Sequence, residues 1–139
     1  MRWGRRWALE FLRRLHVSGC QLSLAFVGDA AMRKLNRQFR GKDATTDVLS
    51  FPSGECPPGC VHAGKRNAAV FKGFLGDVAL CLPMASRLAR RLGTRPQAEA
   101  KLYLAHGLLH LLGHNHHAEA DARKMARWER KLLKHPGML

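Results

Sequence analysis

The chain has 139 residues, a length typical of one domain rather than two. Hydrophobic residues make up 46% of the sequence and charged residues 24%, a composition that is ordinary for a globular protein and argues against disorder. Lysine and arginine number 24 against 10 acidic residues, and the resulting charge of +14 predicts a polyanionic partner, either nucleic acid or an anionic membrane.

The first 19 residues are rich in arginine but contain no apolar stretch of the kind found in secretory signals. Trp3, Trp7, Phe11 and Leu15 fall on one side of a helical projection, which predicts an amphipathic surface helix. No apolar run approaches the roughly 18 residues that a membrane span requires. We therefore expect a soluble, cytoplasmic protein with no membrane partner.

The remaining elements follow from apolar periodicity and from residues that begin or end helices. The pattern predicts a strand over 21–27, a helix capped by Asp29 that runs to about Phe39, and strands over 48–51 and 75–82. Residues 53–73 show little periodicity and are expected to form a long excursion. Pro83 and Pro96 open two further helices, which end at Gly93 and at about Gly113, and a last helix covers 119–134. The predicted fold class is α/β (α+β), a single compact domain over residues 1–139 with a small mixed sheet packed against helices.

Five of the eight histidines lie between positions 106 and 117. His106 and His110 are four residues apart on a predicted helix, so their imidazoles project from one face and can bind the same metal ion. Gly113 can adopt the left-handed conformation that ends a helix and lets the chain turn back. A third histidine can then approach the first two. Three imidazoles leave one position of Zn²⁺ open, which is the arrangement of a catalytic site.

Spacing alone leaves three histidines as candidates for the third ligand. We favour His116, with His114 and His117 as alternatives. The spacing resembles the HxxxHxxGxxH signature of metzincin proteases, in which a glutamate that serves as general base follows the first histidine. Gly107 occupies that position here. The sequence therefore disfavours a peptidase.

Three blocks of the sequence resemble the YbeY endoribonucleases, also called rRNA maturation factors. Residues 106–116 (HGLLHLLGHNH) are similar to that family's HGxLHLxGxDH signature, and residues 35–52 (LNRQFRGKDATTDVLSFP) to its LNxxYRxKDxPTDVLSFP stretch. Residues 75–80 (LGDVAL) match its LGDIVI segment. The chain departs from the family at Asn115, where an aspartate is common, at Ala44–Thr46, which lacks the family's proline, and in a short N-terminus that is expected to lack the leading strand.

The resemblance implies a helix that bears its histidines as zincins do, with one Zn²⁺ per chain held by His106, His110 and His116. It implies a zinc-dependent endoribonuclease of the single-strand type that acts in small-subunit rRNA maturation and in ribosome quality control. The expected partners are small-subunit rRNA and ribosomal proteins, without a small-molecule cofactor. It also implies that Arg40 lies in the active-site cleft. There we expect it to be catalytic, stabilising charge on the phosphoryl oxygens of the transition state.

The alternative function is that of a ribosome-associated RNA-binding factor in which zinc is structural. A metalloprotease is a weaker alternative because of Gly107. No residue is an evident general base. The last helix carries a run of basic residues, which form either a solvated face or a set of phosphate contacts.

Two further features are interpreted without catalytic roles. Asp47 and Asp77 are expected to make capping or turn hydrogen bonds. The four cysteines are expected to be reduced thiols because no secretion signal is present. Cys56, Cys60 and His62 could form a second zinc site, but an incidental loop is the preferred interpretation because only three ligands lie together.

Overall fold

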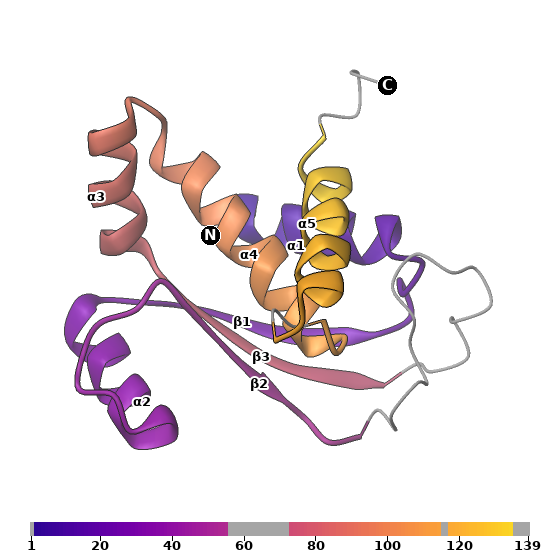
Figure 1. The fold of residues 1–139 in the computed structure, drawn as a ribbon, viewed down its shortest axis with the longest axis horizontal. Coiled ribbons are helices and arrows are strands. Elements are labelled where there is room, and N and C mark those ends of the chain that lie inside the picture. Colours follow the sequence, from indigo (N-terminus) through magenta and orange to yellow (C-terminus); the bar gives the residue numbers. More distant parts are fainter. Residues whose placement is uncertain (1, 56–72, 115–116, 135–139) are drawn as a thin grey trace.

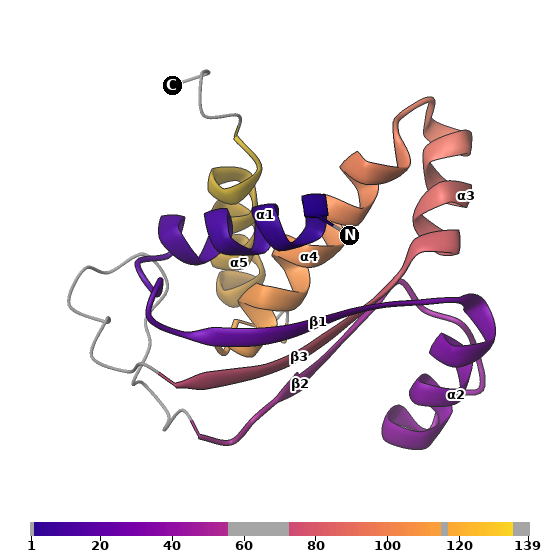
Figure 2. The same ribbon diagram turned by 180° about the vertical axis from the view of Figure 1, so that it is seen from behind.

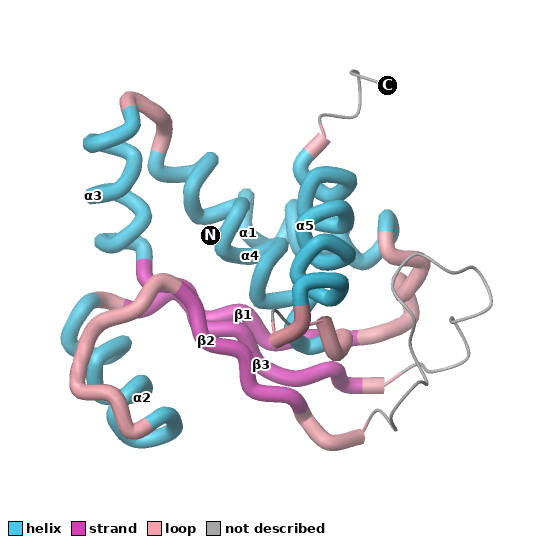
Figure 3. The backbone as a smooth tube through the Cα atoms, viewed as in Figure 1, coloured by secondary structure: helices cyan, strands magenta, loops and turns pink. Residues whose placement is uncertain are grey.

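The computed structural model describes residues 2–55, 73–114 and 117–134. Its elements in chain order are α1 (Arg2–Arg14), β1 (Gln21–Val27), α2 (Asp29–Arg40), β2 (Val48–Pro52), β3 (Phe74–Cys81), α3 (Leu82–Leu92), α4 (Pro96–Leu111) and α5 (Glu119–Leu133). Figure 3 shows how these helices and strands are distributed. Every expected element is present, and most of its ends lie within two residues of the expected ones.

The sheet has the strand order β1-β3-β2. The central strand β3 pairs in parallel with β1 and antiparallel with β2. This arrangement confirms the expected mixed sheet and makes β2 an edge strand. Proline lacks the N–H that a ladder needs, and Pro52 is tolerated because it lies at the end of this edge strand.

The helices cover the two faces of the sheet unequally. Figures 1 and 2 show α1, α4 and α5 on one side of the sheet and α2 on the other. Side chains of β3 alternate between the two faces, so Val78 and Leu80 join the larger core while Ala79 and Cys81 join the smaller core under α2. Helix α4 lies centrally in the larger core, where Leu104 and other residues on several of its sides are fully buried.

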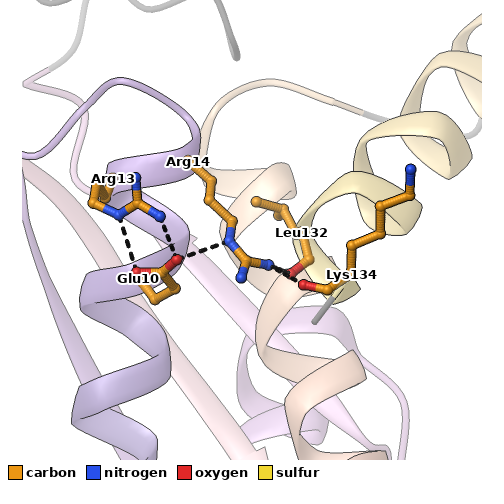
Figure 4. A network of polar contacts seen from close by, with 5 residues as sticks. All are labelled: Glu10, Arg13, Arg14, Leu132 and Lys134. Atoms are coloured by element: carbon orange, nitrogen blue, oxygen red, sulfur yellow. Dashed lines mark hydrogen bonds and ion pairs between the residues drawn. The ribbon is translucent and has the colours of Figure 1, made fainter. Parts of the chain in front are cut away.

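A polar network joins α1 to the end of α5 (Figure 4). The Glu10 carboxylate accepts hydrogen bonds from Arg13 and Arg14, and the Arg14 guanidinium also donates to the backbone carbonyls of Leu132 and Lys134. The Arg13 hydrogen bond, helped by Arg14 and opposed by desolvation, lowers the pKa of Glu10 to about 2. The network holds the first and last helices of the described chain together.

Two local expectations need correction or refinement. Gly28, rather than Asp29, is the N-cap of α2, because the Asp29 carboxylate instead pairs with both Nη atoms of Arg87 on α3 at 2.8 and 2.7 Å. The strand expected to end at residue 82 ends at Cys81, since Leu82 already begins α3. Cys20 and Cys81 are buried thiols, as expected, whereas Cys56 and Cys60 lie outside the described residues.

No helix in the described part of the chain combines the length and the apolar character that crossing a membrane requires.

Candidate metal centre

Helix α4 brings His106 and His110 together. The two side chains lie one helical turn apart on the same face, and their Nε2 atoms are 3.0 Å from each other. The rings meet edge to face, with centroids 4.6 Å apart. Both residues are half-buried, so the nitrogens converge at the surface of the molecule and remain accessible to a ligand.

Gly107 fixes the height of this helix above the sheet. A Cβ at position 107 would lie 2.9 Å from a methyl carbon of Val78 and 3.0 Å from one of Val48. The hydroxyl of Ser50 donates a 2.8 Å hydrogen bond to the Gly107 carbonyl. The residue after His106 therefore faces the sheet at close contact, which leaves no room for the glutamate that a metzincin protease carries there.

Glu129 on α5 orients the first histidine. Its Oε1 lies 2.7 Å from Nδ1 of His106, and both side chains are partly buried. A carboxylate at Nδ1 favours the tautomer with a proton on that nitrogen, which leaves the lone pair of Nε2 directed toward His110. Carboxylate–histidine contacts of this kind are the usual support of histidine ligands in zinc sites.

Glu129 was not predicted as a functional residue from the sequence. No local spacing links it to His106, because the two residues are 23 positions apart on different helices. The available signal was its charge, since Glu129 is the only acidic residue between positions 122 and 134, a stretch that is otherwise basic.

The chemistry of this pair fits Zn²⁺. Two nitrogens bound to tetrahedral zinc at about 2.0–2.1 Å would lie roughly 3.3 Å apart. The observed separation of 3.0 Å between the Nε2 atoms requires only a small adjustment. Within residues 2–55, 73–114 and 117–134, no group of three histidine, cysteine or carboxylate side chains is close enough to hold a metal.

The chain turns directly after the histidine helix, as the sequence predicts. Gly113 has φ 93°, and its N–H donates to the His110 carbonyl at 3.0 Å. The next N–H, that of His114, donates to the Leu109 carbonyl. Burial lowers the pKa of the His114 imidazole, and Lys124 lowers it further. His116 and Asn115 lie outside the described residues, so their predicted roles stay predictions.

Arg40 is the last residue of α2, and its side chain is exposed. Helix α2 covers the opposite face of the sheet from α4 (Figures 1 and 2), and within the described residues Arg40 makes no hydrogen bond or ion pair, including with the two histidines. The edge strand β2 nevertheless borders both regions. The ring of Phe39, beside Arg40, contacts that of Phe51 at 5.0 Å, and Ser50 contacts α4 on the other face.

The other candidate residues have different outcomes. Oδ1 of Asp47 accepts a 2.7 Å hydrogen bond from the Val48 N–H, which is the expected local role. Asp77 lies within β3 with an exposed side chain and makes no such bond to a described residue. Cys56, Cys60 and His62, the alternative zinc site, lie outside the described residues.

Comparison with known sequences gives a family match along nearly the whole chain. The family model described as Endoribonuclease YbeY matches residues 2–137. A curated protein of that name from Myxococcus xanthus is 47% identical over 133 residues, covering 96% of this chain and 42% of the relative. Another, from an Anaeromyxobacter species, is 46% identical over 132 residues, covering 95% of this chain and 62% of the relative. This chain thus spans about half the length of these two relatives.

Among solved structures, the solution structure of TM1509 from Thermotoga maritima has a similar fold. The match has a TM-score of 0.58 and covers 98% of this chain and 89% of the other, at 20% sequence identity. At this low identity, the likeness concerns the fold alone, and it agrees with the expected fold class.

Proposed function

The chain belongs to the YbeY endoribonuclease family, and from this we propose that it is a zinc-dependent endoribonuclease that cleaves single-stranded RNA. The observation that carries the proposal is the histidine pair, with its Nε2 atoms 3.0 Å apart and His106 supported by Glu129. Such a pair is suited to binding a metal rather than to packing in the hydrophobic core, because both side chains remain partly accessible to solvent.

We assign zinc binding to His106, His110 and His116. Of the three candidates for the third ligand, His114 and His117 do not complete a three-ligand group with the other two in the described part of the chain, so His116 is retained. When bound, Zn²⁺ would supply Lewis acidity at a phosphoryl oxygen. Glu129 would keep the proton of His106 on Nδ1, so that Nε2 is available as a ligand.

We assign Arg40 to the phosphate. Its exposed guanidinium has no acidic partner among the described residues, and it occupies the arginine position of the block shared with the family. A planar guanidinium can donate two parallel hydrogen bonds to a phosphoryl group whose charge grows in the transition state. Such a contact requires the RNA to pass the edge strand β2, which both Arg40 and the histidine helix flank.

The charge of +14 favours RNA as the substrate. We propose that the RNA is that of the small ribosomal subunit, that ribosomal proteins assist in its recognition, that the enzyme takes part in ribosome quality control, and that it acts in the cytoplasm. An RNA-binding factor with structural zinc is the competing function. Both functions would use the same metal site and the same basic surface, so only RNA cleavage distinguishes the enzyme from the binding factor.

The decisive experiment is an RNA cleavage assay on protein with a defined metal content. We expect cleavage of single-stranded RNA by the zinc-loaded protein, loss of cleavage with a chelator, and recovery when zinc is restored. His110→Ala should be inactive because it removes one ligand. His16, an exposed histidine distant in sequence from His110, provides the matched control. The variant His16→Asn should cleave RNA normally. If the zinc-loaded protein binds RNA without cutting it, the binding factor is the correct function.

A further inference from the structure

A cavity of about 680 Å³ lies where α3, α4 and the loop before β2 meet. Its volume is within the range of sites that bind small ligands, about 300–1,000 Å³. The walls combine three kinds of surface: apolar side chains from α3, arginines from the same helix, and oxygen atoms from the loop and from α4.

The rim of the cavity is cationic. Arg90 and Arg91 follow Arg87 by three and four residues along α3, the spacing of neighbours on a helix surface, and all three line the cavity. Arg87 is neutralised by its pair with Asp29. Arg90 and Arg91 are exposed, and within the described residues neither makes an ion pair or a hydrogen bond. A bound anion would supply the counter-charge that these two guanidinium groups do not find among the described residues.

Tyr103 supplies a hydroxyl to the cavity wall. The residue is only 6% exposed, yet its hydroxyl makes no hydrogen bond to another described residue. No buried side-chain nitrogen or oxygen of the described residues lacks a partner, so this hydroxyl must reach solvent, and the cavity is where it does so. Burial and the nearby carboxylates of Asp47 and Glu99 raise its pKa, so it stays protonated at neutral pH and can both donate and accept.

Asp47 supplies an acceptor beside that hydroxyl. Oδ1 of its carboxylate accepts from the Val48 N–H and from the Thr46 hydroxyl. The second oxygen makes no hydrogen bond within the described residues. A carboxylate in a cavity with a cationic rim does not suit a simple anion, whereas it suits a ligand that carries hydroxyl donors as well as a negative charge.

We propose that this cavity binds one ribonucleotide of the RNA substrate. Its phosphate would lie between Arg90 and Arg91, and its ribose 2′-hydroxyl would donate to Asp47 and accept from Tyr103. The base would rest on the apolar side chains of Met84 and Leu88. This inference rests on the proposed function, because it takes the bound nucleotide to be one unit of the RNA strand that the enzyme cleaves.

The position of the cavity relative to the histidines supports this assignment. Tyr103 precedes His106 by three residues on α4, so the two lie on neighbouring positions of one helical face, roughly 4.5 Å apart along the axis. A strand held in the cavity would therefore continue toward the metal centre. The 2′-hydroxyl contacts would favour RNA over DNA at this nucleotide.

The test uses the full chain treated with a chelator, so that a phosphate cannot bind through zinc, and adenosine 5′-monophosphate (AMP) as the probe. Tyr103 is the only tyrosine of the chain, so its ring signals in a proton NMR spectrum report directly on the cavity. We expect these signals to shift on titration with AMP. The affinity of each nucleotide is followed through its phosphorus resonance. The protein should bind 2′-deoxyadenosine 5′-monophosphate roughly 3-fold or more weakly than AMP.

Substitutions then test each contact. Arg90→Ala/Arg91→Ala should weaken AMP binding by roughly 10-fold or more, and Tyr103→Phe, which keeps the packing, by roughly 3- to 10-fold. The double variant Arg5→Ala/Arg6→Ala removes the same charge from exposed positions of α1 and should bind AMP like the parent. Unchanged Tyr103 signals, or an equal loss in the control, would overturn the subsite.

These outcomes are separate from those of the cleavage assay. A protein that cleaves RNA but does not bind AMP in the cavity keeps the proposed function and loses the subsite. A protein that binds AMP there but does not cleave RNA keeps the subsite as part of an RNA-binding surface.

Discussion

Oε1 of Glu129 lies 2.7 Å from Nδ1 of His106 and so connects α5 to the histidine helix α4. The contact fixes which imidazole nitrogen carries the proton, and it therefore decides which nitrogen can serve as a ligand. Helix α5 also closes the larger core through the buried side chains of Met125 and Leu132. The same docking that completes the core thus positions the carboxylate that contacts His106.

The first prediction concerns metal content. The purified protein should retain about one Zn²⁺ per chain, and His106→Ala and His110→Ala should lose it, because each removes a ligand. His116→Ala should retain far less than the parent. Elemental analysis after exhaustive dialysis measures the stoichiometry.

The control is His16→Asn, an exposed position with φ 59°, a conformation that asparagine tolerates. It should retain all its zinc. Full retention by His116→Ala would assign the third ligand to His114 or His117. A stoichiometry of two would instead revive the site formed by Cys56, Cys60 and His62.

The second prediction concerns Glu129. Glu129→Ala should weaken zinc affinity by about 10- to 100-fold, the usual effect of removing a carboxylate that supports a histidine ligand. The zinc affinity of Glu129→Gln should fall between that of this variant and that of the parent, because the amide oxygen can still accept a hydrogen bond from the Nδ1–H of His106 but carries no charge. Competition with a chromophoric chelator measures the affinity without any RNA. Glu119→Ala on the same helix removes only a surface pair with Arg123 and should leave the affinity unchanged; an equal loss there would contradict the role of Glu129.

The third prediction separates the enzyme from the binding factor through Arg40. Arg40→Ala should reduce cleavage by about 10²–10³-fold, on the scale of losing one donor to transition-state charge. Arg40→Lys should restore only part of the activity, because an ammonium keeps the charge without the planar pair of donors. RNA affinity and zinc content should change little. Arg37→Ala, one turn earlier on the exposed side of α2, is the control; parental cleavage by Arg40→Ala would end the proposed role.

The fourth prediction concerns salt. If RNA binds through many phosphate contacts, its affinity should fall steeply as salt rises, because the free energy gained by releasing condensed counterions decreases as the bulk salt concentration increases. For six to ten contacts on duplex RNA, the loss is roughly 10³–10⁵-fold between 50 and 200 mM salt, with somewhat less on single strands. Fluorescence anisotropy of a labelled RNA over this range measures the slope. Affinity that does not depend on salt would leave the charge of +14 without a function in RNA binding.

The fifth prediction concerns stability and pH. The pKa of Glu10 in the folded protein is about 2, below the value of 4.5 expected when unfolded, so its ionised form stabilises the fold. This contribution is fully present above pH 4.5 and is lost as the pH falls toward 2. Glu10→Gln should lower the free energy of unfolding at pH 7 by about 1 kcal/mol, a value reduced for solvent screening. Urea unfolding from pH 7 to pH 3 should show the difference from the parent narrowing below pH 4.5, whereas Glu119→Gln should show no such trend.

Local sequence was sufficient for the secondary structure and for the pairing of the two histidines on α4. The strand over 21–27 was predicted at its observed bounds, because alternation of apolar residues depends only on neighbours along the chain. The pairing of His106 with His110 follows from helix geometry in the same way. Gly113 has a positive φ in the turn after α4, as expected, since glycine adopts this conformation without a steric cost whatever the surrounding fold.

Tertiary structure decided the contacts between elements. The Asp29 carboxylate faces Arg87 rather than its own helix end, and Glu129 meets His106 across 23 residues. The cavity beside Tyr103 is lined by residues of α3, of α4 and of the loop before β2, which only the packed fold brings together. Spacing along the sequence fixes none of these contacts, because each depends on how the helices pack on the sheet. The strand order of that sheet, β1-β3-β2, is set by burial of apolar surface from distant parts of the chain. The sequence by itself therefore determined the family and the histidine face of α4. The packed fold decided which carboxylate contacts His106 and on which face of the sheet α2 carries Arg40.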